Sequence, residues 1–339
     1  MKKFVNDPKN FVPEMLNGIV LANPDSLRYV PEYNLIMRAD APRDDKVSIV
    51  QGSGSGHEPA HVMVVGRGML DAACPGDVFA APPMDYVYET TKLLNSPKGV
   101  LHLINNYTGD RMAFDMGREM ADAEGIRVET LIIDDDVSVK DSTYTVGRRG
   151  VAGNFFVIKA VGAAAEEGAE LDELVALGTR VNGVTRTMGM ALTACTPPAK
   201  GSPLFELGDD EMEMGVGIHG EPGRRREKLA SANEIIDELL EAVVTDLPYQ
   251  EGDEVALMIN GLGGTRSASS TSSTAAPTPS SPTGASPCAR TTSGSTAPPS
   301  TWPAPPSPWS SSTTSWSGCS RPRRRSPSAS SSGRRPGRS

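Results

Sequence analysis

One stretch decides the fold: Lys46-Val47-Ser48-Ile49-Val50-Gln51-Gly52-Ser53-Gly54-Ser55-Gly56-His57-Glu58-Pro59. Its first six residues have the pattern of a strand, and this strand runs directly into a glycine-rich loop that carries His57. Glycines let the backbone approach a ligand closely, and imidazole is the side chain best suited to proton transfer or nucleophilic attack near neutral pH. The stretch therefore predicts a strand that ends in a ligand-binding loop.

Two further strands follow the same plan. Residues 99–105 predict a strand that leads into Asn106-Tyr107-Thr108-Gly109-Asp110, and residues 127–133 predict another that ends at Asp134-Asp135-Asp136. A helical pattern at residues 110–123 lies between them. Strands that alternate with helices favour a layered α/β domain with a largely parallel sheet, whose ligands lie beyond the carboxyl ends of the strands. We therefore expect His57 and Asp110 to meet at that edge.

A second histidine has nearly the same setting as His57. It is His219, within Gly217-Ile218-His219-Gly220-Glu221-Pro222-Gly223. The alternation over residues 212–218 predicts a strand that delivers His219 to a turn. Because the chain has only four histidines, two in such similar surroundings indicate one shared site.

The sequence up to Thr265 predicts two α/β domains. The first spans residues 1–181 and has further helices at residues 9–22, 150–168 and 171–181. The second spans residues 182–265 and is truncated, because nothing after its last strand continues the pattern. Its elements are strands at residues 185–195, 212–218 and 254–260, and an amphipathic helix at residues 231–247 with Ser231 as its N-cap.

The composition changes abruptly at Arg266. Residues 266–339 contain only Arg, Ser, Ala, Thr, Pro, Gly, Cys and Trp, so they cannot bury a core and are expected to form a disordered, low-complexity tail. One interpretation is a basic tail that binds an acidic partner through residues 321–325. We favour a frameshift in the gene or in its sequencing, because these residues are the ones that GC-rich codons give when read out of frame.

Charge and composition exclude several classes of protein. With nine of the 33 basic residues in the tail, residues 1–265 keep 24 basic against 42 acidic residues, a net charge of −18. Such acidity disfavours nucleic acid and anionic membranes as partners. Cys74 and Cys195 form no paired motif, and the chain has neither a signal peptide nor an apolar run that could span a bilayer. We expect a cytoplasmic protein.

The remaining candidate sites are weaker. Gly52-Ser53-Gly54-Ser55-Gly56 lacks the spacing of a nucleotide-binding loop, and Asp134-Asp135-Asp136 is more typical of solvated or capping carboxylates than of a metal site, so we expect no metal. His102 alternates within a strand and is expected to be packed, whereas His61 is expected to support the site or the fold. Arg224-Arg225-Arg226 fits an anion contact and a solvated turn equally well.

Several motifs, in this order and spacing, resemble the substrate-binding subunit of the dihydroxyacetone (glycerone) kinase family. They are Arg38–Pro42, Ser55–Pro59, Ala73–Gly76, Asn106–Asp110, Ile132–Val137, Tyr144–Ala152 and Gly215–Gly223. The resemblance covers residues 1–265 almost continuously. Family members continue after Gly-Leu-Gly-Gly-Thr with Pro-Leu and an amphipathic helix, which supports the frameshift interpretation.

The resemblance implies specific chemistry. His219 matches the family's covalent histidine, whose ring nitrogen adds to the ketone carbon of the substrate and gives a hemiaminal. Asp110 matches the general base for the terminal hydroxyl, and His57 its partner. Gly54 and Asn105 also match substrate-contacting positions. A kinase subunit of this kind phosphorylates an alcohol group.

The resemblance also implies partners. This subunit is expected to hold no cofactor, because ATP or ADP and Mg²⁺ bind a separate helical subunit or domain. In the multi-subunit form, which we favour here, a phosphotransferase-system phosphoprotein recharges that partner. A homodimer is also expected, in the cytoplasm.

Two departures from the family pattern leave alternatives open. Asn105 stands where family members carry lysine, and Ala81 where they often carry serine. A related triose or tetrulose is therefore an alternative substrate to dihydroxyacetone. A non-catalytic ketose-binding module that regulates a partner is an alternative function, although such relatives tend to lose the reactive histidine. A third alternative is a truncated chain that does not fold.

Overall fold

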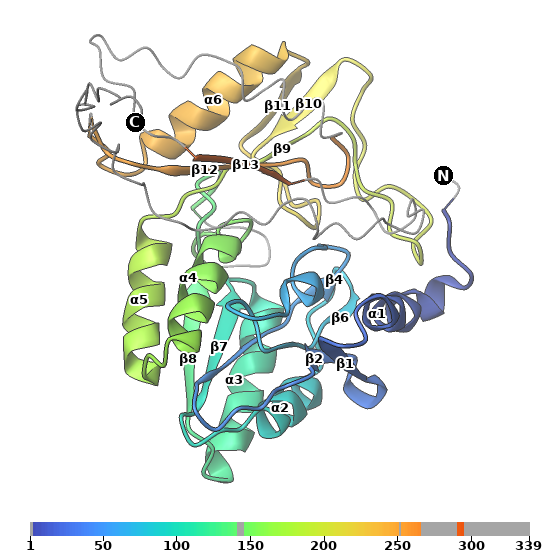
Figure 1. Cartoon of the computed structure of the whole chain (residues 1–339). Coiled ribbons are helices and arrows are strands. Elements are labelled where there is room, and N and C mark those ends of the chain that lie inside the picture. The colour runs from blue at the N-terminus through green and yellow to red at the C-terminus, as the bar shows by residue number, and fades with distance from the viewer. Residues whose placement is uncertain (1–2, 141–145, 251, 266–289, 295–339) are drawn as a thin grey trace, which may run out of the picture. The chain divides into compact units, whose positions relative to one another are not determined.

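A six-stranded sheet is the largest in a computed structural model that describes residues 3–140, 146–250, 252–265 and 290–294 (Figure 1). In spatial order its strands are β1 (Leu27–Val30), β2 (Leu35–Arg38), β5 (Ala72–Ala73), β3 (Ser48–Gln51), β7 (Val100–Asn105) and β8 (Val128–Ile133). Pairing is parallel from β5 through β3 and β7 to β8, and antiparallel from β1 through β2 to β5. The parallel sheet is thus confirmed for β5, β3, β7 and β8. The sequence did not predict the antiparallel edge, because two four-residue strands carry little periodicity.

Helices cover both faces of this sheet. They are α1 (Phe11–Ala22), α2 (Met84–Leu93), α3 (Thr108–Ala123), α4 (Asn154–Glu166) and α5 (Leu171–Gly183). Successive residues of a strand point to opposite faces. In β7, Leu101 and Leu103 therefore pack in the core that contains α4 and α5, whereas Val100 and Ile104 pack in the core that contains α2 and α3. The result is a three-layer α/β fold, as predicted.

The helices predicted for the first part of the chain are all present with small shifts. α1 starts at Phe11 after a 3-10 turn at Pro8–Asn10, α3 starts two residues earlier than predicted, and α2 was not predicted. α5 continues to Gly183, past the domain boundary predicted after residue 181. By contacts the chain divides into residues 1–301 and 302–339, and every described residue belongs to the first unit. The two-domain division stays a prediction.

The strands predicted for residues 182–265 are corrected by the structure. The strand expected at residues 185–195 is reduced to β9 (Met190–Ala191), because Thr187 bonds instead to the backbone of Asp135 and Val137. β10 (Glu211–Met214) ends earlier than predicted, since Gly215 takes a left-handed conformation with φ +77°. β10 pairs antiparallel with β9 and with β11 (Arg225–Lys228), which the arginine-rich sequence did not predict.

The last described elements are α6 (Ala232–Val244) and β12 (Ala256–Asn260), close to their predicted ranges. Ser231 caps α6 as predicted, within a capping box that Glu234 completes. β12 pairs in parallel with β13 (Arg290–Gly294), a strand that the composition of the tail does not predict. The other predictions for residues 266–339 lie outside the described residues.

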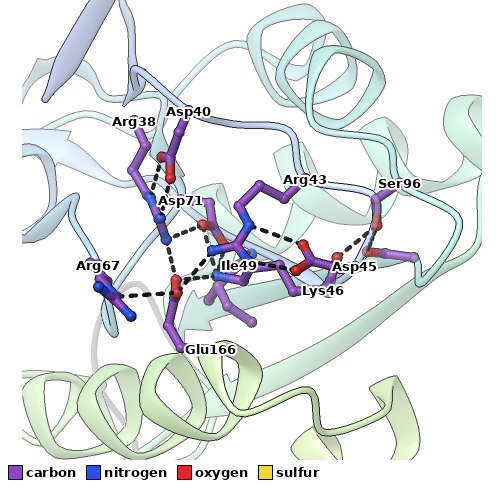
Figure 2. Close-up of polar contacts among 11 residues, drawn as sticks. Arg38, Asp40, Arg43, Asp45, Lys46, Ile49, Arg67, Asp71, Ser96 and Glu166 are labelled. Atoms are coloured by element: carbon purple, nitrogen blue, oxygen red, sulfur yellow. Dashed lines mark hydrogen bonds and ion pairs between the residues drawn. The ribbon is translucent and has the colours of Figure 1, made fainter.

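A buried ion-pair cluster lies at the amino ends of the parallel strands (Figure 2). Lys46 Nζ lies 2.9 Å from both Asp71 Oδ1 and Glu166 Oε1, and Arg38 pairs with the same two carboxylates. Asp71 also accepts a hydrogen bond of 2.8 Å from the backbone N–H of Ile49. The cluster fixes the end of α4 against β2, β3 and β5. The candidate site lies at the other end of these strands, beyond their carboxyl ends.

None of the helices in the described part of the chain combines the length and apolar character needed to cross a bilayer.

Candidate functional site

The glycine-rich loop after β3 orients His57. The loop forms β4 (Gly54–Ser55), which pairs in parallel with β6 (Gly76–Val78). A methyl group at Gly54 would lie 2.6 Å from the backbone nitrogen of Ala80, so only glycine fits there. His57 Nδ1 donates a hydrogen bond of 2.7 Å to the Gly54 carbonyl, because a carbonyl oxygen can only accept. The lone pair of this ring is therefore on Nε2, which is buried without a partner among the described residues.

Burial keeps His57 uncharged. Desolvation, reinforced by His219 and His61, lowers the pKa of His57 to about 3. At neutral pH its Nε2 is therefore a hydrogen-bond acceptor. It can accept a hydrogen bond from a ligand hydroxyl.

Asp110 lies in the first turn of α3 and is 2% exposed. Ser53 Oγ, from the glycine-rich loop, donates a hydrogen bond of 2.9 Å to Asp110 Oδ2. Burial raises the pKa of Asp110 to about 7, although the Ser53 hydrogen bond and His219 partly oppose the shift. A carboxyl group with a pKa near neutrality is suited to act as a general base.

His219 lies in a turn after β10 and is held by Glu221. His219 Nδ1 lies 2.9 Å from Glu221 Oε1, and the His219 backbone N–H donates to Glu221 Oε2 at 2.9 Å. Burial raises the pKa of Glu221, but the side-chain hydrogen bond and charge of His219 and the hydrogen bonds from backbone N–H groups together outweigh it and lower this pKa overall, so the carboxylate is ionised and accepts from Nδ1–H. The lone pair of His219 is consequently on Nε2. This is the tautomer that nucleophilic attack by Nε2 requires.

The predicted site histidines come together. The ring centroids of His57 and His219 lie 4.9 Å apart, and the rings of Phe79 and Tyr107 lie 5.8 Å and 4.8 Å from that of His219. Asp110 is near enough to His219 to interact electrostatically with it. Phe79, with the unusual φ of +60°, also packs 5.0 Å from the ring of His57. The loops after β3, β7 and β10 thus build one constellation.

Asn105 adds unused hydrogen-bonding capacity. It ends β7, is 2% exposed, and its Oδ1 has no partner among the described residues. The same holds for the hydroxyl of Tyr107. Buried polar groups normally have partners, so these unpartnered atoms, one of them on the Tyr107 side chain whose ring lies 4.8 Å from that of His219, are suited to a polar ligand. Ala81, the second departure from the family pattern, lies next to Gly109 at the start of α3.

Four residues of this site were not predicted as functional. Glu221 and Tyr107 stand within the quoted histidine and Asn106–Asp110 motifs, so proximity in sequence could have pointed to them. Ser53 stands within the glycine-rich loop. Nothing in the sequence pointed to Phe79, because its contact with the two histidines depends on the turn after β6.

The other sequence candidates have structural partners. His102 packs 5.1 Å from the ring of Phe114, and its Nε2 lies 2.8 Å from Thr91 Oγ1, which confirms a packed role. His61 Nδ1 lies 2.7 Å from Gln51 Oε1 at the end of β3. It supports the strand that leads to His57.

The acidic and basic runs are likewise engaged. Asp135 accepts from the backbone of Val151 and Gly153, and Asp136 pairs with Arg149. Arg224 lies in an exposed bend and donates to the carbonyls of Val137 and Ser138, so the run is partly solvated and partly engaged; the anion contact stays a prediction. Among the described residues, no cluster of three or more histidine, cysteine or acidic side chains could hold a metal ion.

Comparison with known proteins identifies close relatives. Residues 17–275 match the Dak1 domain family. The dihydroxyacetone-binding subunit DhaK of the PTS-dependent dihydroxyacetone kinase 1 of Listeria innocua is 48% identical over 265 residues, which cover 78% of this chain and 80% of that subunit. The corresponding subunit of the PEP-dependent kinase of Escherichia coli is 42% identical over 290 residues, 78% of this chain and 81% of that subunit. The D-erythrulose kinase of Mycolicibacterium smegmatis is 38% identical over 78% of this chain and 46% of its own length.

Two solved structures share the fold. The dihydroxyacetone kinase from C. freundii in complex with AMP-PNP and Mg²⁺ has a TM-score of 0.75 at 34% identity, over 80% of this chain. The match spans only 50% of the C. freundii chain. The dihydroxyacetone kinase operon co-activator Dha-DhaQ has a TM-score of 0.72 at 36% identity, over 77% of this chain and 80% of that one.

Proposed function

The chain belongs to the Dak1 domain family, and from this premise we propose that it binds dihydroxyacetone covalently through His219 and presents it for phosphorylation by a partner subunit. It would then be the substrate-binding subunit of a glycerone kinase, a phosphotransferase that acts on an alcohol group. The observation that carries the proposal is the hydrogen bond between His219 Nδ1 and Glu221, which leaves the lone pair on Nε2.

In the covalent step, the Nε2 lone pair of His219 attacks the ketone carbon, and a C–N bond forms while the C=O π electrons move to oxygen. The Nδ1 proton leaves across the 2.9 Å hydrogen bond to Glu221 and is relayed from there to the former carbonyl oxygen, so that Glu221 returns to its ionised form and charge and protons balance. The product is a neutral hemiaminal. Only a carbonyl compound can be captured in this way, which excludes glycerol.

In the transfer step, Asp110 accepts the proton of a terminal hydroxyl as that oxygen forms a bond to the incoming phosphorus, and the bond between this phosphorus and its donor breaks, so that the donor leaves with the electron pair. Its pKa of about 7 means that the carboxylate is present at neutral pH and is still basic enough to help. His57 Nε2 and Asn105 Oδ1 each accept a hydrogen bond from a hydroxyl, and the Gly54 backbone borders the same space.

We propose that the phosphoryl donor belongs to another protein. The names of the Listeria innocua and Escherichia coli relatives place their subunits in PTS-dependent and PEP-dependent kinases. A helical subunit that binds ATP or ADP with Mg²⁺, recharged by a phosphotransferase-system phosphoprotein, is therefore the proposed partner. On this proposal the subunit holds no cofactor of its own, acts in the cytoplasm and forms a homodimer.

Carbon-13 NMR and mass spectrometry test the covalent step. With dihydroxyacetone labelled at the ketone carbon, the wild-type protein should convert the ketone signal into a tetrahedral one, and native mass spectrometry should show the full ligand mass. A Schiff base on a lysine would instead lose one water. His219→Ala should abolish the adduct, and an adduct that survives in this variant would remove His219 from its role.

A second candidate function has its own support. Dha-DhaQ, which shares the fold, is named an operon co-activator, so this chain could bind a ketose in order to regulate a partner. The distinction is catalytic: adding the helical subunit and its phosphoryl donor should consume dihydroxyacetone if the chain serves a kinase. Erythrulose should be assayed in parallel, because the Mycolicibacterium smegmatis relative is named a D-erythrulose kinase.

A further inference from the structure

Arg149 joins two parts of the candidate site. It is completely buried, its Nε donates to Asp136 Oδ2 at 2.7 Å, and its Nη2 donates to the Gly215 carbonyl at 2.8 Å. Asp136 follows β8 of the large sheet, whereas Gly215 begins the turn that carries His219. One guanidinium therefore fastens that turn to the edge of the sheet.

The remaining edge of the guanidinium faces Glu221. Arg149 Nη1 is buried and has no hydrogen-bond partner among the described residues. A methyl group at Gly217 would lie 2.0 Å from Glu221 Oε2 and 2.6 Å from Arg149 Nη1. The carboxylate that holds His219 and the unpartnered edge of Arg149 thus converge on one point, which is open only because residue 217 is glycine.

A buried cation in this position has a direct electrostatic effect. It favours the ionised form of the neighbouring carboxylate and disfavours a second positive charge on the imidazole bonded to it. We propose that Arg149 is a positioning residue of the candidate site, which fixes the His219 turn to Asp136 and keeps Glu221 ionised and the His219 ring uncharged. The importance of this role for catalysis rests on the proposed function, since only an uncharged ring can attack a ketone.

Other groups around the ring also affect the protonation of His219. His57, Tyr107, Asp110 and Glu221 stay unchanged in the test. Asp135 and Asp136 are near enough to Tyr107 to interact electrostatically with it, and Asp136 is the direct counter-charge of Arg149. It therefore supplies a second variant with an effect of opposite sign.

Nitrogen-15 NMR of histidine-labelled protein without any ketose measures the effect directly. Four histidines give a simple spectrum, and His219→Gln assigns the signal of interest. In Arg149→Met, the pH at which the His219 ring gains its second proton should rise by about one unit, because a nearby positive charge is lost. In Asp136→Asn it should fall by about half a unit, because Arg149 is no longer neutralised. Arg149→Lys keeps the charge and should stay near the wild-type value.

The outcomes separate this inference from the proposed function. A purely structural role for Arg149 would lower the folded fraction or broaden the signals without moving the midpoint. If both Arg149→Met and Asp136→Asn titrate within about 0.2 units of the wild type, the inference is wrong. If Arg149→Met does not fold, the titration midpoint of His219 in Asp136→Asn still tests the inference: a downward shift supports it, and no shift overturns it. No ketose is present in this titration, so a negative result for Arg149 does not change the result of the adduct test on the wild type. Likewise, a negative adduct test does not change the titration result.

Discussion

The rings of His57 and His219 lie 4.9 Å apart with their planes at 75°, although they follow strands of two different sheets. Each ring has its Nδ1 fixed by an acceptor, the Gly54 carbonyl for His57 and Glu221 for His219. Each therefore offers the lone pair of Nε2. Two such nitrogens therefore lie close together beside Asp110. One of them can attack a carbonyl carbon, and the other can accept a hydrogen bond from a hydroxyl of the same ligand.

Glu221→Gln should weaken covalent capture while His219 is still present. A glutamine side chain can donate as well as accept, so it no longer imposes the Nδ1–H tautomer on His219. We expect the amount of adduct at a fixed ketose concentration to fall about tenfold or more, measured by carbon-13 NMR. Glu206→Gln, at an exposed carboxyl in the same region, is the matched control and should keep the wild-type level. Equal adduct in Glu221→Gln and the wild type would rule out this role for Glu221.

Asp110→Asn should stabilise the protein and abolish phosphorylation. The folded-state pKa of Asp110, about 7, lies above its unfolded value of about 3.8, so ionisation of the buried carboxyl opposes folding. This cost is absent below pH 4, grows between pH 4 and 7, and is complete above pH 7. The variant should therefore gain about 1–3 kcal/mol at pH 8 and almost nothing at pH 4.

Thermal unfolding of Asp110→Asn and the wild type across this pH range checks the sign. The Ser53 hydroxyl can still donate to the asparagine oxygen, so the local contact is retained. A variant that is less stable than the wild type at pH 8 would contradict the argument.

Asn105→Leu should separate ligand binding from stability. Asn105 Oδ1 is buried without a partner, so its replacement by an apolar side chain of similar size should leave the melting temperature unchanged or raise it. The loss of an acceptor for a ligand hydroxyl should weaken ketose binding about tenfold, measured by calorimetry. Unchanged affinity would mean that Asn105 does not contact the ligand.

Sequence reasoning located the fold and the histidines because their signals are local. The buried runs of β3, β7 and β8 alternate with strong helical patterns, and each ends in a glycine-rich or polar loop. In a parallel sheet these ends lie at one edge, so His57 and Asp110 could be placed without coordinates. The glycine-rich setting of His219 assigned it to the same site, and the resemblance to a known family then added its covalent chemistry.

What sequence reasoning missed depends on contacts between distant segments. β1, β2 and β5 are too short for a periodic pattern and exist through their neighbours. Thr187 leaves a predicted strand because the backbone of Asp135 and Val137 offers it better partners. The last two arginines of the triple-arginine run begin β11, with Arg225 paired to Glu227 and Glu238.

Glu166→Gln should destabilise the fold at neutral pH and not in strong acid. Burial raises the pKa of Glu166, but the hydrogen bonds and charges of Lys46 and Arg38 outweigh it and lower this pKa to about 2 (Figure 2). A lowered folded-state pKa stabilises the protein above the unfolded value near 4.5, and this contribution is lost as the pH falls towards 2. Breaking the buried cluster should cost on the order of 3 kcal/mol at pH 7.

Urea unfolding at pH 7 and pH 3 measures this difference. The exposed neighbour supplies the control variant, Glu167→Gln, which should match the wild type at both pH values. An equal loss for Glu166→Gln at both pH values would show that the cluster acts through packing rather than charge.

The DNA that encodes residues after Thr265 should restore a periodic, apolar sequence in one of the other two reading frames. α6 is amphipathic, yet none of its residues is fully buried, and Ile235, Ile236, Leu239 and Leu240 are each only half-buried. β12 likewise buries no residue fully. Elements with this pattern normally pack against further structure, since each buried aliphatic side chain stabilises a fold by about 1.5–3 kcal/mol. A protein expressed from the restored frame should therefore melt at a higher temperature than the present chain, and a gene in which neither other frame resumes such a pattern would end the frameshift hypothesis.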